Sequence, residues 1–206
     1  MRPFVAARAG RALASADGCR MRLFVAVHLP SEVRDTLASV QDRLRRAQAD
    51  VSWVKAANLH ITLKFLGETE PARLQRIGSA LAEAARAAAP FSLTVAGVGT
   101  FGGRIPRVVW AGVRDGAAPL EALAGAVENG LAPLGIAKER RGFAAHFTLG
   151  RVRSARNAAD LLAAIRDEPA APLGTVRVEE CVLMQSQLDP RGSIYTALER
   201  FPLGRA

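Results

Sequence analysis

The chain has 206 residues, half of them apolar, and carries a formal net charge of +9 at pH 7. No apolar run approaches the roughly 20 residues of a membrane-spanning helix, so we expect a soluble, globular protein with no membrane contact. Arginine carries almost all of the positive charge, which indicates a polyanionic partner, although solvated helix faces would explain the same excess.

Residues 1–20 are rich in arginine and poor in acidic residues. This composition is compatible with an organelle transit peptide, but a strand pattern begins at Met21, which would serve as a start. We therefore expect residues 1–20 to be a disordered extension or a misassigned start. Cys19 and Cys181, the only cysteines, predict neither a disulfide framework nor a zinc site, which favours a cytoplasmic setting.

The predicted elements mix strands and helices without strict alternation. In chain order, hydrophobic periodicity and Pro, Gly and Ser boundaries predict a strand at 22–28, a helix at 31–48, strands at 51–54 and 60–66, a helix at 71–89, strands at 91–96 and 107–113, a helix at 118–132, a strand at 146–152, a helix at 157–166 and strands at 174–184 and 193–200. This order predicts an α+β fold with antiparallel sheets rather than a doubly wound parallel sheet.

A short internal repeat lies in two of the predicted strands. His60-Ile-Thr-Leu and His146-Phe-Thr-Leu share the pattern His-x-Thr-Leu. Two of the chain's three histidines follow it, which chance alone explains poorly. We expect two similar lobes, each contributing one of these strands. His28 lacks the pattern, and we interpret it as structural or as lying at the edge of the site.

Strand alternation assigns side chains in these two strands to opposite faces. It predicts that His60, Thr62 and Lys64 share one face, that Ile61, Leu63 and Phe65 share the other, and that His146 and Thr148 share a face. The apolar faces would be covered by helices, and the polar faces would line a cleft between the lobes. Phe24, Phe65 and Phe143 are candidates for stacking on a ligand, although core packing explains each of them too.

Two imidazoles and two hydroxyls facing each other suit transfer at a phosphodiester. Near pH 7 a neutral imidazole can take a proton from water while a protonated one gives a proton to the leaving oxygen. Thr62 and Thr148 can hydrogen-bond phosphate oxygens, and a nearby cation would stabilise the developing charge. This chemistry needs no cofactor, and the sequence offers no metal-ligand set.

The chain resembles the RNA 2′,3′-cyclic phosphodiesterases of the 2H phosphoesterase superfamily, also called LigT-like or 2′-5′ RNA ligase proteins. The matching segments span residues 21–203 and are Met21-Arg-Leu-Phe-Val-Ala-Val, Trp53-Val-Lys, Asn58-Leu-His-Ile-Thr-Leu-Lys-Phe-Leu-Gly67, Pro106-Arg-Val-Val-Trp110, Leu131-Ala-Pro-Leu-Gly135, His146-Phe-Thr-Leu-Gly-Arg151 and Phe201-Pro-Leu203. The resemblance implies one bilobal, pseudo-symmetric domain over residues 21–203, with its active site between the lobes.

The resemblance also implies individual roles. His60 would be the proton donor to the leaving ribose oxygen, His146 the proton acceptor that activates water, and Arg151 a phosphate ligand. The product would be a 2′-phosphomonoester, and members of the family also join such ends as 2′-5′ linkages. The implied partner is RNA with 2′,3′-cyclic phosphate ends, such as tRNA fragments, bound by a monomer.

Arg151 poses a geometric problem, because its odd offset from His146 would turn it to the opposite face of a regular strand. Gly150 suggests a break in the pleating that would bring Arg151 back. Three other functions compete with the main hypothesis: the same chemistry on a small cyclic nucleotide or a nucleotide-sugar cyclic phosphate, a non-catalytic RNA-binding module, and a di-histidine metalloenzyme.

Overall fold

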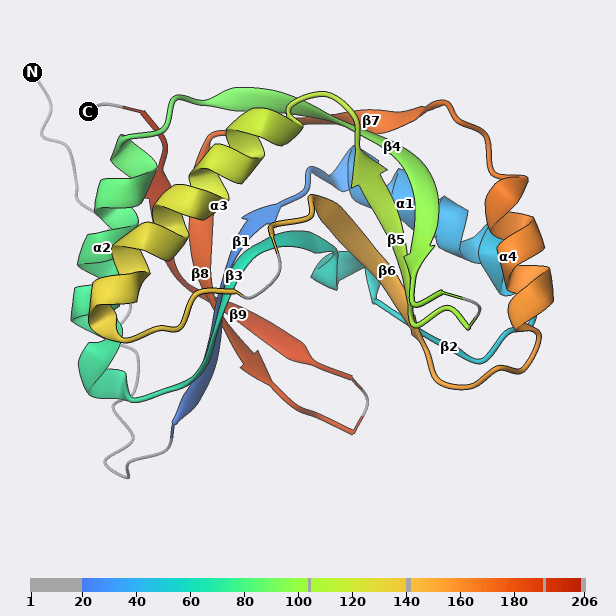
Figure 1. Ribbon diagram of the computed structural model, residues 1–206, viewed down its shortest axis with the longest axis horizontal. Helices are drawn as coiled ribbons and strands as arrows, with labels where there is room; N and C mark the ends of the chain where they lie inside the picture. The colour runs from blue at the N-terminus through green and yellow to red at the C-terminus, as the bar shows by residue number, and fades with distance from the viewer. Residues whose placement is uncertain (1–19, 104, 140–141, 191, 205–206) are drawn as a thin grey trace, which may run out of the picture.

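The computed structural model describes residues 20–103, 105–139, 142–190 and 192–204, so the prediction for residues 1–19 lies outside the described residues. Figure 1 shows the chain path. The first strand begins at Met21, as the sequence predicts. No helix in the described ranges is long and apolar enough to cross a membrane.

The described strands form two antiparallel sheets, which confirms the predicted α+β arrangement. The elements are β1 (Met21–His28), α1 (Ser31–Arg45), β2 (Val51–Trp53), η1 (Ala56–Asn58), β3 (His60–Thr69), η2 (Pro71–Arg73), α2 (Leu74–Arg86), β4 (Phe91–Phe101), β5 (Val108–Val113), α3 (Ala117–Leu131), η3 (Ala132–Leu134), β6 (His146–Val152), α4 (Ala158–Arg166), β7 (Pro172–Val178), β8 (Glu180–Gln187) and β9 (Ile194–Pro202). One sheet has the order β3-β1-β8-β9 and the other β2-β6-β5-β4-β7.

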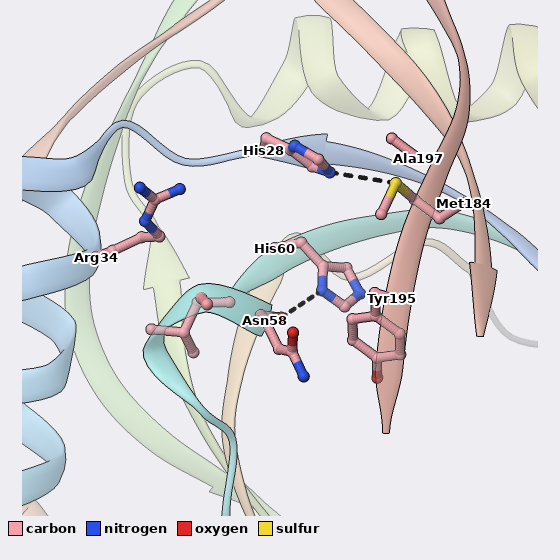
Figure 2. Close-up of a pocket in the computed structure, with 9 residues that line it drawn as sticks. His28, Arg34, Asn58, His60, Met184, Tyr195 and Ala197 are labelled. Carbon is pink, nitrogen blue, oxygen red and sulfur yellow. Dashed lines mark hydrogen bonds between the residues drawn. The ribbon is translucent and has the colours of Figure 1, made fainter. Parts of the chain in front are cut away.

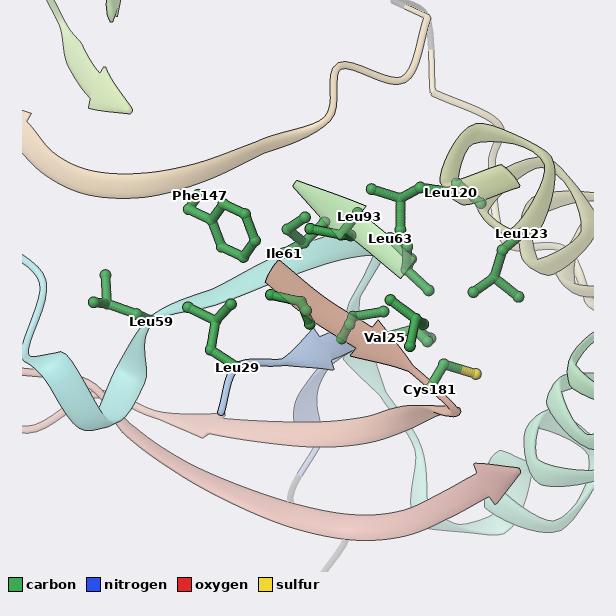
Figure 3. Packing of buried hydrophobic residues seen from close by; sticks show 14 of the residues in the cluster. Val25, Leu29, Leu59, Ile61, Leu63, Leu93, Leu120, Leu123, Phe147 and Cys181 are labelled. Atoms are coloured by element: carbon green, nitrogen blue, oxygen red, sulfur yellow. The ribbon is translucent and has the colours of Figure 1, made fainter. Parts of the chain in front are cut away.

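Each sheet and its helices form one lobe. The first lobe combines β3-β1-β8-β9 with α2 and α3, and the second combines β2-β6-β5-β4-β7 with α1 and α4 (Figure 1). The chain crosses between the lobes repeatedly: β1 and β3 belong to the first and β2 to the second. Buried side chains of both lobes pack in one continuous cluster, in which Ile61 of β3 lies near Phe147 of β6 (Figure 3).

The prediction of one strand over 174–184 is wrong. β7 ends at Val178 in the second lobe, and β8 begins at Glu180 in the first. The connecting Glu179 accepts a hydrogen bond from the backbone N–H of Leu203 at 2.7 Å. Val178 and Cys181 are both buried, so the apolar pattern continues through the crossing and does not reveal it.

The predicted faces of β3 are also wrong beyond Leu63. The pairing of β1 with β3 shifts register twice, between Leu23 and Phe24 and between Val25 and Ala26, and such irregularities reverse the alternation of side chains. Lys64 therefore points into the protein, with its side chain 1% exposed. Phe65 is instead 53% exposed, on the face that carries Phe24.

Lys64 is held inside by two hydrogen bonds and one longer ion pair. Its Nζ lies 2.8 Å from Glu128 Oε1, 2.7 Å from the carbonyl oxygen of Ala137 and 3.6 Å from Glu139 Oε1. These contacts satisfy a charge that would be costly to bury alone. They also connect β3 to α3 and to the segment that precedes β6.

Candidate active site

The two motif histidines begin strands of different lobes, His60 in β3 and His146 in β6. His60 Nδ1 lies 2.7 Å from the carbonyl oxygen of Asn58, and His146 Nδ1 lies 2.7 Å from that of Ala144. A carbonyl oxygen can only accept, so each Nδ1 donates its proton and each Nε2 is left as the exchangeable position. The two motifs thus present their imidazoles in the same way.

His60 is enclosed by aromatic rings. Its ring centroid lies 4.9 Å from that of Phe24 and 5.4 Å from that of Tyr195, which meets it edge-on. Burial is the main cause that lowers the pKa of His60 below its usual 6.5, and the nearby His28 and His146 lower it further, against the hydrogen bond to Asn58, which raises it. The charge of His146 thus acts on His60, although the two rings belong to different lobes.

The threonines two residues beyond each histidine lie on the same face as that histidine. Thr62 Oγ1 is 3.0 Å from His60 Nε2, so in the free protein the threonine hydroxyl is hydrogen-bonded to the nitrogen that is left for proton exchange. In the second lobe Thr148 pairs with Trp110 of β5. The ring of Phe101, which also packs against Trp110, meets the His146 ring edge-on, with centroids 5.0 Å apart.

The predicted break in the pleating before Arg151 is present. In the pairing of β5 with β6, Trp110 lies opposite Thr148 and Val109 lies opposite Gly150, so the register shifts by one residue. Val108, which shares a face with Trp110, lies opposite Arg151. Arg151 therefore projects from the same face as Thr148 and His146, and it is exposed.

A cavity of about 190 Å³ adjoins His60 (Figure 2). Its lining residues are His28, Arg34, Ala57, Asn58, Leu59, His60, Met184, Tyr195 and Ala197. His28, interpreted from the sequence as structural or at the edge of the site, lines this cavity, with its Nε2 3.3 Å from Met184 Sδ. Burial and the charge of Arg200 lower the pKa of His28.

Sequence reasoning missed Asn58 and Tyr195 as supports of His60. The Asn58 side chain donates to the carbonyl oxygen of Ser193 at 2.8 Å and so connects η1 to the chain just before β9. Tyr195 reaches His60 from β9, at the far edge of the sheet. Neither contact has a local sequence signal. Of the three stacking candidates, Phe24 is buried, Phe143 packs against the core, and Phe65 is exposed beside Phe24.

Comparison with known proteins places the chain in a family. The family model described as LigT like Phosphoesterase matches residues 27–110 and again residues 112–195. The RNA 2′,3′-cyclic phosphodiesterase of Methanothermobacter thermautotrophicus is 36% identical, over 89% of this chain and 100% of its own length. That of Archaeoglobus fulgidus is 38% identical, over 88% of this chain and 99% of its own length. The crystal structure of E. coli LigT in apo form is 29% identical with a TM-score of 0.73, over 91% of this chain and 99% of that chain.

The bilobal fold and the duplicated histidine motif define a two-histidine phosphoesterase. Within that class, the chain belongs to the LigT-like phosphoesterase family. The resemblance and the fold class predicted from the sequence are thereby confirmed.

Proposed function

We propose that the protein hydrolyses the 2′,3′-cyclic phosphate at the end of an RNA chain to a 2′-phosphomonoester. The observation that carries this proposal is the matched pair His60 and His146, whose Nδ1 protons are both fixed by carbonyl oxygens. Their Nε2 atoms are left for proton transfer, as in-line displacement at phosphorus requires. Relatives that cover most of the chain are named RNA 2′,3′-cyclic phosphodiesterases, which supports the substrate class.

The proposed step moves two protons. Water attacks phosphorus and gives a proton to Nε2 of His146, while the bond from phosphorus to O3′ breaks and O3′ takes the proton of His60 Nε2. The 2′ ester bond survives, which leaves a 2′-phosphate and a 3′-hydroxyl. A 5′-hydroxyl in place of water would give a 2′-5′ linkage by the same transfers, which is the ligase activity of the proposal.

His60 must be protonated to act as the donor, although its burial favours the neutral ring. A bound cyclic phosphate carries one negative charge, and a nearby anion raises the pKa of an imidazole. Substrate binding would therefore favour the protonated form of His60, which is the form that gives a proton to O3′. It would also displace Thr62 from His60 Nε2 and free that hydroxyl for a phosphate oxygen.

Arg151 and Thr148 are assigned to the phosphate oxygens from the second lobe, because both share the face of His146. A guanidinium group can donate two parallel hydrogen bonds to a phosphate and stabilise the charge that grows in the transition state. Phe65 offers the exposed aromatic surface of the first lobe for a base. We extend the proposal to a cytoplasmic monomer with one catalytic domain over residues 21–203, acting on RNA ends such as those of tRNA fragments.

The deciding experiment incubates the purified protein and excess EDTA with a short RNA ending in a 2′,3′-cyclic phosphate and locates the terminal phosphate of the product. We expect a 2′-phosphate, formed at the same rate without the chelator. Loss of activity in EDTA would point to a metalloenzyme. Salt-sensitive binding without turnover would point to an RNA-binding module, and turnover confined to small cyclic phosphates would point to another substrate.

A further inference from the structure

The cavity beside His60 continues away from that ring toward the start of α1 (Figure 2). Arg34, in the first turn of α1, lies on the far side of His60 from Tyr195, and His28, at the end of β1, lies above His60 with its ring toward Met184 (Figure 2). Its volume of about 190 Å³ is below the range of roughly 300 to 1,000 Å³ typical of pockets that enclose a whole small-molecule ligand. The space therefore suits a small group that belongs to a larger ligand.

The charged groups around this cavity favour an anion. Arg34 makes one hydrogen bond, from Nη1 to the carbonyl oxygen of Leu29 at 3.2 Å, and has no ion pair among the described residues. The charges of Arg34 and Arg200 both lower the pKa of His28, whereas Glu180 raises it. Glu180 is itself paired with Arg200. The guanidinium of Arg34 is thus a cation without a carboxylate partner at the edge of the cavity.

The proposed reaction sets which part of the substrate lies there. His60 protonates O3′, so the terminal ribose must contact His60, which also lines the cavity. In an RNA chain the 5′ carbon of that ribose carries the next phosphodiester. This group is one sugar unit from the reacting phosphorus and is the nearest other anion of the substrate.

We propose that the cavity lined by Arg34, His28 and Asn58 binds the phosphodiester on the 5′ side of the terminal nucleotide. The inference rests on the proposed function and adds to it a substrate class: the enzyme selects the ends of oligonucleotides over mononucleoside cyclic phosphates. Arg34 is the main ligand, because its planar fork matches two phosphate oxygens. The Asn58 side-chain amide already donates a hydrogen bond to the carbonyl oxygen of Ser193, so Asn58 shapes the wall of the cavity and is not assigned as a phosphate ligand.

The test compares kcat/KM for adenosine 2′,3′-cyclic phosphate with that for a dinucleotide ending in the same cyclic phosphate. A charge-assisted hydrogen bond contributes about 1.5–3 kcal/mol, so we expect wild-type protein to prefer the dinucleotide by about 10- to 100-fold at low salt. Arg34→Gln should lose most of this preference, and Arg34→Lys should keep part of it. Arg46→Gln, which removes an exposed arginine from the end of the same helix, should keep all of it.

Two results would overturn the inference. A wild-type protein that hydrolyses both substrates with equal efficiency has no such subsite. An Arg34→Gln variant with the same fractional loss on both substrates would show that Arg34 contacts the terminal nucleoside or only supports the fold.

A binding measurement decides the matter even if neither substrate is turned over, a result that would refute the proposed function instead. Calorimetry on the wild-type protein compares adenosine 2′-monophosphate with adenosine 2′,5′-bisphosphate. Binding of the bisphosphate at least about tenfold more tightly, with the difference lost in Arg34→Gln, supports the subsite. Equal affinity for the two ligands contradicts it.

Discussion

His60 and His146 stand in the same relation to the chain that precedes them: each Nδ1 lies 2.7 Å from the carbonyl oxygen of the residue two positions earlier. The surroundings of the two rings differ. His60 packs against both Phe24 and Tyr195 with Thr62 at its Nε2, whereas Nε2 of His146 has no hydrogen-bond partner in the described part of the chain. The two imidazoles are thus attached to the chain alike but surrounded differently, and the proposed mechanism gives them different roles.

The pH profile of kcat/KM tests these roles. The protonated fraction of His60 falls as pH rises through its pKa, and burial holds that pKa below 6.5, so activity should already decline with rising pH in the acid range. His60→Ala should remove this decline and reduce kcat about 10²- to 10⁴-fold. His146→Ala should reduce kcat similarly but leave the decline in place, because His60 is still present. Exchanged effects of the two variants would reverse the assignment, and thermal unfolding curves would serve as the control for folding.

Arg151→Gln should reduce kcat/KM by about 10²- to 10³-fold, the usual cost of losing a donor that faces developing charge. Its position on the face of His146 depends on the register shift opposite Val109 and Trp110. Arg156→Gln is the matched control, since Arg156 is exposed in the segment after β6. Similar kinetics for the two variants would remove Arg151 from the site.

Substitutions of the Lys64–Glu128 pair test whether Lys64 of β3 points into the protein. Glu128→Gln leaves a buried ammonium with weaker partners and should cost about 2–3 kcal/mol of unfolding free energy, less than the 3–5 kcal/mol for a wholly buried pair, because Glu128 is 26% exposed. Lys64→Met removes the buried charge and keeps apolar volume, so it should cost only about 1 kcal/mol. Urea denaturation measures both. A larger cost for Lys64→Met than for Glu128→Gln would contradict this order.

Asn58→Ala should impair catalysis without touching the reacting groups. It removes the hydrogen bond to Ser193 that fixes η1, whose last residue supplies the acceptor for His60 Nδ1. We expect kcat to fall about tenfold, as is typical for loss of a residue that orients a catalytic group, with a smaller change in KM. Asn58→Asp, which keeps the size but cannot donate and adds a negative charge to the wall of the cavity, should lower kcat at least as much as Asn58→Ala. Wild-type kcat in both variants would show that the carbonyl is held without this hydrogen bond.

The sequence predicted the strand faces of those candidate-site residues whose orientation depends on local pattern. His60, Thr62, His146 and Thr148 follow strand alternation from the start of each strand, and the Gly150 signal led to the correct face for Arg151. Lys64 and Phe65 were assigned to the wrong faces because the irregularities in β3 arise from its pairing with β1, a non-local property. The crossing at Glu179 was missed because apolar residues flank it in both sheets.

The path of the chain between the lobes has a consequence for synthesis. The first lobe needs β1 from the beginning of the described chain and β8 and β9 from its end, with β1 lying between β3 and β8. Neither lobe corresponds to one half of the sequence, so cutting the chain between residues 110 and 112, where the two family matches meet, would leave two fragments that each lack strands of both sheets. On the ribosome, the ring of Tyr195 can reach His60 only after β9 has emerged, so the aromatic enclosure of His60 is completed by a strand that lies more than 130 residues after it in the chain.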